Sequence, residues 1–243
     1  MIARLRRIAG RKRDAGSDAR LAVLLVFVAG AANAGGFIAI GHYTSHMTGI
    51  VSGMADDLAL GRHALVAAGA GALCAFVGGA AVSALMVNWA RRRGLESLFA
   101  LPLALEAALL AGFGLFGAGS GTGEAVLSVT LLLCFVMGLQ NAVITKLSGA
   151  RIRTTHVTGL VTDLGIEIGR ALYPSRGDGP PVRADREKLG MLAGLTGTFL
   201  GAGALGAVGF GRFGPPAALP LAALLAAIAA GPIAADIAAA RGR

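Results

Sequence analysis

The chain has 243 residues, of which 55% are apolar, 14% are charged and 38 are glycine, and its mean hydropathy is +0.71. A soluble domain of this length carries about 25% charged residues, so this composition excludes a water-exposed globule as well as a disordered or fibrous chain. Lys and Arg outnumber Asp and Glu by 22 to 13, but they lie in short clusters between apolar stretches, which argues against a nucleic-acid partner. The sequence predicts a compact polytopic membrane protein.

Six apolar stretches are long enough to cross a hydrocarbon core, which takes about 20 residues of helix. Only one of them contains a charged residue, Glu106. The predicted spans are residues 21–40, 64–89, 98–117, 125–144, 189–210 and 217–235. The predicted fold class is therefore an all-α membrane protein with six transmembrane helices.

The positions of the cations predict the orientation of the spans. All but two of the 22 Lys and Arg residues lie in the N-terminal arm (residues 1–20), the second and fourth connections, or the C-terminal tail. The two exceptions are Arg62 and Arg212. Because cytoplasmic connections of membrane proteins carry the excess of Lys and Arg, both termini are expected in the cytoplasm, and the basic arm with them.

An eight-residue motif occurs twice in the chain. The sequence TSHMTGIV at 44–51 returns as TTHVTGLV at 154–161, with five of eight positions identical and an offset of 110 residues. Upstream, GAANA at 30–34 is matched by GLQNA at 138–142. The chain is therefore expected to contain an internal repeat.

The repeat divides one membrane domain into two three-helix halves, residues 21–120 and 121–243. Each motif follows the first span of its half. An odd number of crossings per half gives the halves opposite orientations, an arrangement that is common among secondary transporters. The first motif is then expected in an external connection and the second in a cytoplasmic connection.

The segment after each motif is too short and too polar to be a further span. Residues 48–60 contain an acidic pair that includes Asp57, and residues 158–172 contain Asp163 and Glu167. A short re-entrant or interfacial helix is predicted in each half, with the preceding Thr and Ser residues as N-caps. Asp163 and Glu167 are four residues apart, so a solvated ion-pair network is favoured over a metal site.

The polar residues that recur in both halves are the candidate substrate-binding residues. They are Asn33, Thr44, His46, Thr48, Asn141, Thr154, His156 and Thr158. Polar groups at membrane depth are often functional, and the duplication strengthens that interpretation. Structural histidines that cap helices, and asparagines that hydrogen-bond across helices, are the alternatives. Asp57, Asp163 and Glu167 are secondary candidates; Asp57 and Glu167 each follow their histidine by eleven residues, about three helical turns, and share its face.

Further polar residues lie outside the repeat. Glu106 is the only acid inside a predicted span, and leaving it ionised in lipid would cost several kcal/mol. Glu106 is expected to be either a proton-coupling site or a protonated structural carboxyl group. His42 lacks a counterpart in the other half, which favours a place at the membrane interface.

The Asn-containing first span, the TSHMTG stretch with the acidic pair after it, and the TTHVTGLVTDLG stretch together resemble the YoaK family of bacterial inner-membrane proteins. The resemblance runs from Leu21 to the sixth span and leaves out the basic arm. It implies a multi-pass protein of the bacterial inner membrane. Because the family is one of unknown function, the resemblance implies no chemistry.

The chain lacks the HExxH, GxSxG and P-loop signatures and any paired-cysteine metal spacing. We therefore expect a small-solute transporter or permease, with proton coupling through Glu106 left open, no cofactor and no metal. Its expected partners are the lipid bilayer and a small solute, and a homodimer is left open. A membrane-embedded enzyme acting on a lipid or prenyl substrate and a non-catalytic membrane scaffold are the alternatives.

Overall fold

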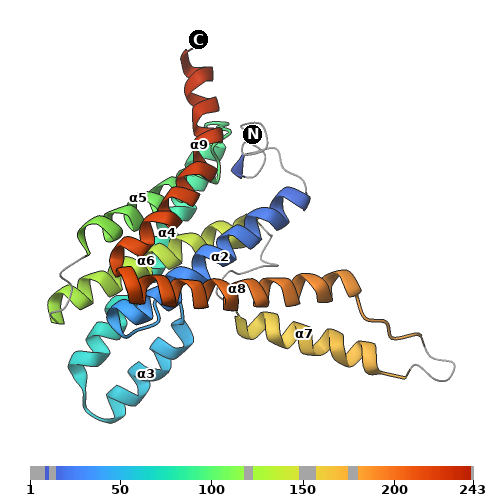
Figure 1. Cartoon of the computed structure of the whole chain (residues 1–243), viewed down its shortest axis with the longest axis horizontal. Helices are drawn as coiled ribbons and strands as arrows, with labels where there is room; N and C mark the ends of the chain where they lie inside the picture. Colours follow the sequence, from blue (N-terminus) through green and yellow to red (C-terminus); the bar gives the residue numbers. More distant parts are fainter. Residues whose placement is uncertain (1–8, 11–14, 118–122, 148–156, 175–179, 242–243) are drawn as a thin grey trace.

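The computed structural model describes residues 9–10, 15–117, 123–147, 157–174 and 180–241 (Figure 1). Within these ranges the chain forms α-helices, one short 3-10 helix and no strand. The helices are α2 (Ala15–Ile40), α3 (Met47–Ala59), α4 (His63–Arg92), α5 (Ala100–Phe116), α6 (Gly123–Leu147), α7 (Val157–Leu172), α8 (Arg186–Phe213), the 3-10 helix η1 (Pro215–Ala218) and α9 (Leu219–Arg241).

Five of the described helices are long and apolar enough to cross a membrane, namely α2, α4, α6, α8 and α9 together with η1. The chain is therefore a helical membrane-spanning protein. Each of these helices contains one of the predicted spans. The remaining predicted span, 98–117, forms the shorter α5, whose 17 residues give about 26 Å of helix.

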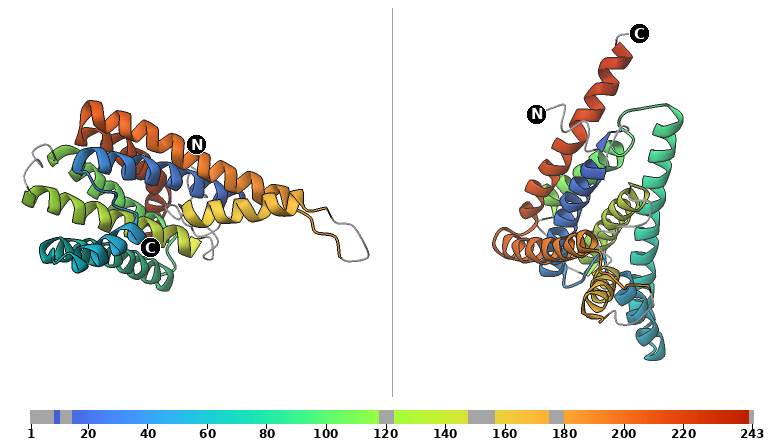
Figure 2. Two further views of the ribbon diagram at one scale, coloured as in Figure 1. Left: turned by 90° about the horizontal axis from the view of Figure 1, so that it is seen from below. Right: turned by 90° about the vertical axis from the view of Figure 1, so that its right-hand side faces the viewer.

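The long helices pack in two parallel pairs. Gly30 of α2 lies against Phe199 of α8, and Gly35 lies against Phe210, so the two helices run in the same direction. In the other pair, Gly79 of α4 lies against Phe135 of α6. Further along both helices, Lys146 Nζ of α6 lies 3.4 Å from the Ala84 carbonyl of α4. Figure 2 shows α2 and α8 side by side and α4 beneath α6.

Helices α5 and α9 pack against each other in opposite directions. Gly114, near the end of α5, lies against Leu219 at the start of α9. At the other end of the pair, the Asp236 carboxylate of α9 accepts hydrogen bonds from the backbone N–H groups of Glu96 and Ser97 at 2.8 and 2.9 Å. Asp236 thus ties the last helix to the connection between α4 and α5.

Two glycines allow the parallel pairs to approach at backbone distance. A Cβ on Gly30 would meet the carbonyl oxygen of Phe199, and a Cβ on Gly138 would meet the carbonyl oxygen of Phe76. Without a hydrophobic driving force between helices in lipid, such close contacts are a main source of association. These glycines are the matched first residues of the segments 30–34 and 138–142, so both copies make the same kind of contact.

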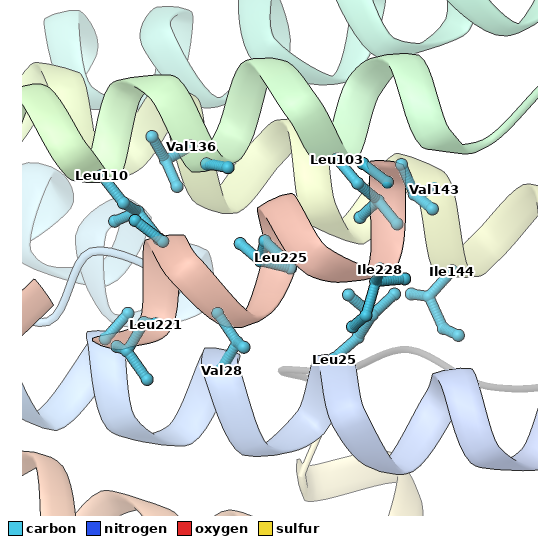
Figure 3. Packing of buried hydrophobic residues seen from close by; sticks show 14 of the residues in the cluster. Leu25, Val28, Leu103, Leu110, Val136, Val143, Ile144, Leu221, Leu225 and Ile228 are labelled. Atoms are coloured by element: carbon cyan, nitrogen blue, oxygen red, sulfur yellow. The ribbon is translucent and has the colours of Figure 1, made fainter. Parts of the chain in front are cut away.

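The apolar core lies where α2, α5, α6 and α9 meet (Figure 3). Leu25 of α2, Leu103 of α5, Ile144 of α6 and Ile228 of α9 are almost completely buried there. Because α2 and α5 come from the first predicted half and α6 and α9 from the second, the core joins the two halves. Neither half contains a complete core alone.

The two short predicted helices are α3 and α7, and each packs against the long helix that follows it, α4 and α8. The hairpin of α7 and α8 projects from the rest of the molecule at the right of Figure 1. The prediction of a Thr or Ser cap is wrong for α3: the N-cap residue is His46, and its side chain makes no capping hydrogen bond. Ser45 instead donates to Asn33, which takes its hydroxyl away from the helix end. The residues before α7 lie outside the described part of the chain.

Candidate functional site

A cavity of about 510 Å³ lies between α3, α4, the first turns of α6 and the segment after α2. This volume is within the range of small-molecule sites. Most of its wall is apolar, with Ile50, Met54, Leu65 and Leu127 among the lining residues. The polar residues that line it are His42, Tyr43, His46, Asp57 and Thr130.

One face of α3 supplies a wall of the cavity. Gly49, Ile50, Gly53, Met54 and Asp57 all line it, in the i, i+4, i+8 spacing of a single helix face. His46 lies at the start of this face and Asp57 near its end, in agreement with the predicted shared face. Their Cα atoms are about 17 Å apart along the axis at 1.5 Å per residue, which places the two residues at opposite ends of the cavity.

Glycines on α3 and α4 give the cavity its shape. A Cβ on Gly49 would lie 2.6 Å from Nδ1 of His46, so glycine there leaves room for the imidazole. A Cβ on Gly69 would lie 2.5 Å from Cγ of Met54, so glycine there lets α3 and α4 approach. At Gly53 a Cβ would meet nothing within 4 Å, because this position opens into the cavity.

Asp57 is the one formally charged residue among those that line the cavity. Its carboxylate lies 3.6 Å from Nη1 of Arg62, and the two side chains are 20% and 58% exposed. No Lys or Arg lines the cavity in the part of the chain that the structure describes. The cavity is therefore acidic at one end, with only a loose, solvent-accessible partner for the carboxylate.

Asn33 does not line the cavity; it holds the segment that does. Its Oδ1 accepts hydrogen bonds from the backbone N–H of Ser45 at 3.2 Å and from the Ser45 hydroxyl at 2.8 Å. Thr44 beside it is buried, and its hydroxyl finds no hydrogen-bond partner among the described residues. Thr48 is exposed and lies outside the cavity wall. Asn33 thus holds Ser45, the residue before His46, and neither Asn33 nor Thr44 lines the cavity.

Glu106 is completely buried between α5 and α6. The side-chain amide of Gln140 donates a hydrogen bond of 2.9 Å to its Oε1. The other oxygen of Glu106, and the amide oxygen of Gln140, have no hydrogen-bond partner within the described ranges. The one acid inside a predicted span is therefore paired with a neutral amide and lies away from the cavity.

The second motif is described only from Val157 onwards, so Thr154 and His156 lie outside the described residues. Thr158 is exposed, and its carbonyl accepts a hydrogen bond from Thr162 one turn later. Asn141 donates a hydrogen bond of 2.9 Å to the carbonyl of Met137 in its own helix. The described residues of the second motif do not line the cavity of the first.

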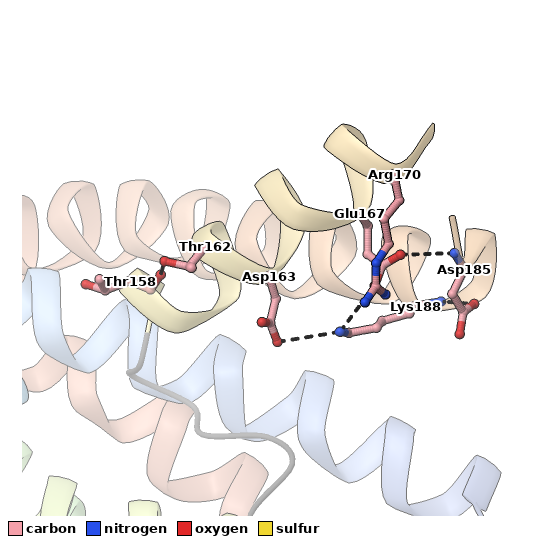
Figure 4. A network of polar contacts seen from close by, with 7 residues as sticks. All are labelled: Thr158, Thr162, Asp163, Glu167, Arg170, Asp185 and Lys188. Atoms are coloured by element: carbon pink, nitrogen blue, oxygen red, sulfur yellow. Dashed lines mark hydrogen bonds and ion pairs between the residues drawn. The ribbon is translucent and has the colours of Figure 1, made fainter. Parts of the chain in front are cut away.

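Glu167 anchors α7 on α8 through a polar network (Figure 4). Its fully buried carboxylate accepts hydrogen bonds from Arg170 at 2.9 Å and from the backbone N–H of Asp185 at 3.0 Å. Lys188 Nζ lies 3.4 Å from Glu167 and 3.8 Å from Asp163. The Asp185 hydrogen bond, helped by Lys188 and Arg170 and opposed by burial, lowers the pKa of Glu167 below its ordinary value.

Among the described residues, apolar side chains pack at the place in the second half that matches the α4 side of the cavity. Phe76 and Phe199 face the two matched glycines, Gly138 and Gly30, so they mark equivalent positions on α4 and α8. Seven and four residues before them, α4 has Gly69 and Ala72 whereas α8 has Leu192 and Leu195. The apolar cluster at this place joins α2, α7 and α8; its members are Val26, Leu160, Leu164, Leu192, Leu195 and Phe199.

The structure thus brings together two of the candidates, His46 and Asp57, in one cavity. Tyr43 and Thr130 were not predicted as lining residues, and His42 was expected only at the membrane interface. His42 and Tyr43 directly precede the repeated motif, and that proximity was the available signal. Within the described ranges no three His, Cys, Asp or Glu side chains are grouped as metal ligands.

Comparison with known proteins gives a family for the chain. Residues 21–231 match the family described as "Protein of unknown function (DUF1275)". YoaK-like proteins are in this family, which agrees with the resemblance noted from the motifs. No curated protein and no solved structure matches the chain. Because the match covers most of the sequence, the chain belongs to the DUF1275 family.

Proposed function

We propose that this protein is a small-solute transporter of the bacterial inner membrane, built from two inverted three-helix repeats with both termini in the cytoplasm. The packing directions support the inverted arrangement. Helices α2 and α8 are parallel, α4 and α6 are parallel, and α5 and α9 are antiparallel. In a protein with six alternating crossings, the first and fifth helices cross in the same direction, and so do the second and fourth, whereas the third and sixth cross in opposite directions. The observed helix pairs have these directions.

A single observation carries the proposal of transport. Two matched sites are packed differently. Each consists of a short helix, the long helix after it and the first long helix of the other half. Between α3, α4 and α6 there is a cavity, whereas among the described residues of α7, α8 and α2 the leucines of the apolar cluster pack against one another. In alternating access, each conformation has one site open and the inverted counterpart of that site closed.

The ion pairs of Lys188 are proposed to hold the α7 site closed. Lys188 joins α8 to Glu167 and Asp163 of α7, next to the apolar cluster. Opening that site would separate these groups, and alternating access would then close the cavity on the α3 side. Glu106 remains the proposed proton-coupling residue, because it is buried at the junction of α5 and α6 with one oxygen that accepts no hydrogen bond from described residues.

Reciprocal labelling of two introduced cysteines tests alternating access without knowledge of the solute. Cys74 and Cys134 are replaced by Ala, and the reporters Gly53→Cys and Val26→Cys are introduced separately. A membrane-impermeant maleimide is then applied from either face of sealed vesicles. We expect Gly53→Cys to react and Val26→Cys, whose position is buried in the apolar cluster, to stay unreactive.

Adding Lys188→Ala should reverse this pattern. Val26→Cys should become reactive from the face opposite to that which labels Gly53→Cys, and the labelling of Gly53→Cys should fall. Arg186→Ala, an exposed cation at the start of the same helix, is the matched control and should change neither reporter. Val26→Cys that never reacts, or two reporters that rise together, would contradict alternating access.

A membrane enzyme acting on a lipid or prenyl substrate is the second candidate. It is favoured by the fact that, in the described part of the chain, the cavity is lined by the first motif alone. An enzyme of this kind needs one permanent cleft, so Gly53→Cys should react in every variant and Val26→Cys in none. A non-catalytic scaffold needs no cavity, so the cavity gives that alternative no support.

A further inference from the structure

Two equivalent carboxylates of the molecule are neutralised to different extents. Glu167 accepts two hydrogen bonds and lies within 3.4 Å of Lys188, so three protein groups satisfy it. Asp57, its counterpart in the first half, has Arg62 as its one ion-pair partner among the described residues. That partner lies 3.6 Å away on a side chain that is 58% exposed.

The less neutralised carboxylate is the one that faces a cavity. Asp57 lines the cavity beside α3, and neither Arg62 nor any other described Lys or Arg lines it with Asp57. A cavity with one negative group and an apolar wall favours a ligand that carries one positive group on an apolar body, since a carboxylate that a ligand covers from water is stable only when it is paired. His42, Tyr43 and His46 at the far end add polar groups that can accept or donate a hydrogen bond.

We propose that the cavity binds a small amphipathic organic amine, whose ammonium group pairs with Asp57 in place of Arg62. This inference rests on the proposed transport function, for which the cavity is the solute site. The apolar body of the amine lies against Ile50, Met54 and Leu65, and the absence of a side chain at Gly53 leaves room for it. Arg62 is then a competitor for the carboxylate rather than a ligand-binding residue.

Three probes of one shape and different charge test this assignment: benzylamine, benzyl alcohol and benzoate. Binding to the purified full-length protein is measured by calorimetry and by the shift in Tm. Benzylamine should bind about tenfold more tightly than benzyl alcohol, because its ammonium group forms an ion pair with Asp57 whereas the hydroxyl group donates only a hydrogen bond from a neutral donor. Benzoate should bind most weakly of the three.

Two substitutions with opposite expected effects establish whether the cavity prefers a cationic or an anionic ligand. Asp57→Asn should weaken benzylamine to the level of benzyl alcohol, whereas Arg62→Gln should strengthen benzylamine several-fold by removing its competitor. An anion-binding cavity would give the reverse for both variants. Preferred binding of benzoate, or an Asp57→Asn variant that binds benzylamine as before, would overturn the proposal.

A third substitution places the probe in the cavity. Gly53→Leu should abolish binding, because its side chain enters the space next to Asp57. Gly112→Leu on α5, also a position where a Cβ meets nothing within 4 Å, is the control and should bind normally. Binding that survives Gly53→Leu would place the amine elsewhere and overturn the proposal. The transport proposal is judged separately, by the reciprocal labelling of Gly53→Cys and Val26→Cys.

Discussion

At the scale of single residues, the pair of Glu106 and Gln140 makes a clear prediction about stability. Glu106→Leu removes the acceptor of a buried amide, which leaves the Gln140 N–H group without its hydrogen bond. The expected loss is about 1–3 kcal/mol in the free energy of unfolding. The double variant Glu106→Leu/Gln140→Leu should recover most of this loss, because no polar group is then left unpaired. Thermal unfolding in detergent measures both.

The second half of the chain provides the physical precedent for this double variant. The sequence ALPLA begins both α5 at Ala100 and the segment at Ala218, and the position that matches Glu106 is Leu224. An apolar residue in place of Glu106 is therefore compatible with this type of helix. A double variant that is no more stable than Glu106→Leu alone would show that Glu106 has another partner.

The candidate residues could be found from sequence only where the repeat or the membrane made them unusual. Glu106 was identifiable as the one acid in a predicted span, but its partner Gln140 was not, because a single amide in an apolar helix has no periodic signal. Asn33 was predicted from the repeat, yet its role is to hold Ser45. That distinction depends on how the segment after α2 folds back, which the local sequence does not determine.

At the scale of elements, the lowered pKa of Glu167 predicts a pH-dependent attachment of α7 to α8. A carboxylate whose pKa is lower in the folded protein stabilises the fold fully above its ordinary pKa of 4.5. The contribution is lost as the pH falls below that value and through the lowered pKa of the folded state. Glu167→Gln should therefore lower the Tm at pH 7, and the difference from the unchanged protein should shrink towards pH 4.

The control for this comparison is Glu187→Gln, an exposed acid at the start of α8. It should have little effect on the Tm between pH 7 and pH 4, because its carboxylate is in solvent. The Tm of each variant is compared with the Tm of the protein without the substitution at the same pH, so the effect of titrating the other acids cancels. A Glu167→Gln difference that stays constant over this pH range would contradict the assignment of the network to the ionised carboxylate.

The positions of the helices were largely predictable, because apolar length and the repeat determine them. Each predicted span contains or overlaps one observed helix, and the two short helices follow the repeated motifs. The capping residue of α3 was not predictable, because Ser45 can serve either the helix end or Asn33, and the tertiary contact prevails. The matches of Phe76 with Phe199 and of the two ALPLA segments were available in the sequence, but they are short and gained meaning only from the packing.

At the scale of the whole molecule, the sequence could predict two related halves but not how they differ. The difference arises from side-chain volume at matched positions: Gly69 and Ala72 on α4 correspond to Leu192 and Leu195 on α8. The consequence depends on which helices face these positions. Only the packing of α3 with α4 and of α7 with α8 turns small residues into a cavity and leucines into a closed contact.

If the leucines close the α7 site, removing them should loosen that site specifically. Leu192→Ala and Leu195→Ala each delete buried methyl groups and should cost about 2–5 kcal/mol of stability. The same change at Leu200 and Leu205, which are 74% and 64% exposed on the same helix, should cost less than about 1 kcal/mol. Hydrogen exchange should accelerate in α7 for the first pair and not for the second. Equal destabilisation by the two pairs would mean that the leucines do not hold the site closed, and the difference between the halves would then have no part in alternating access.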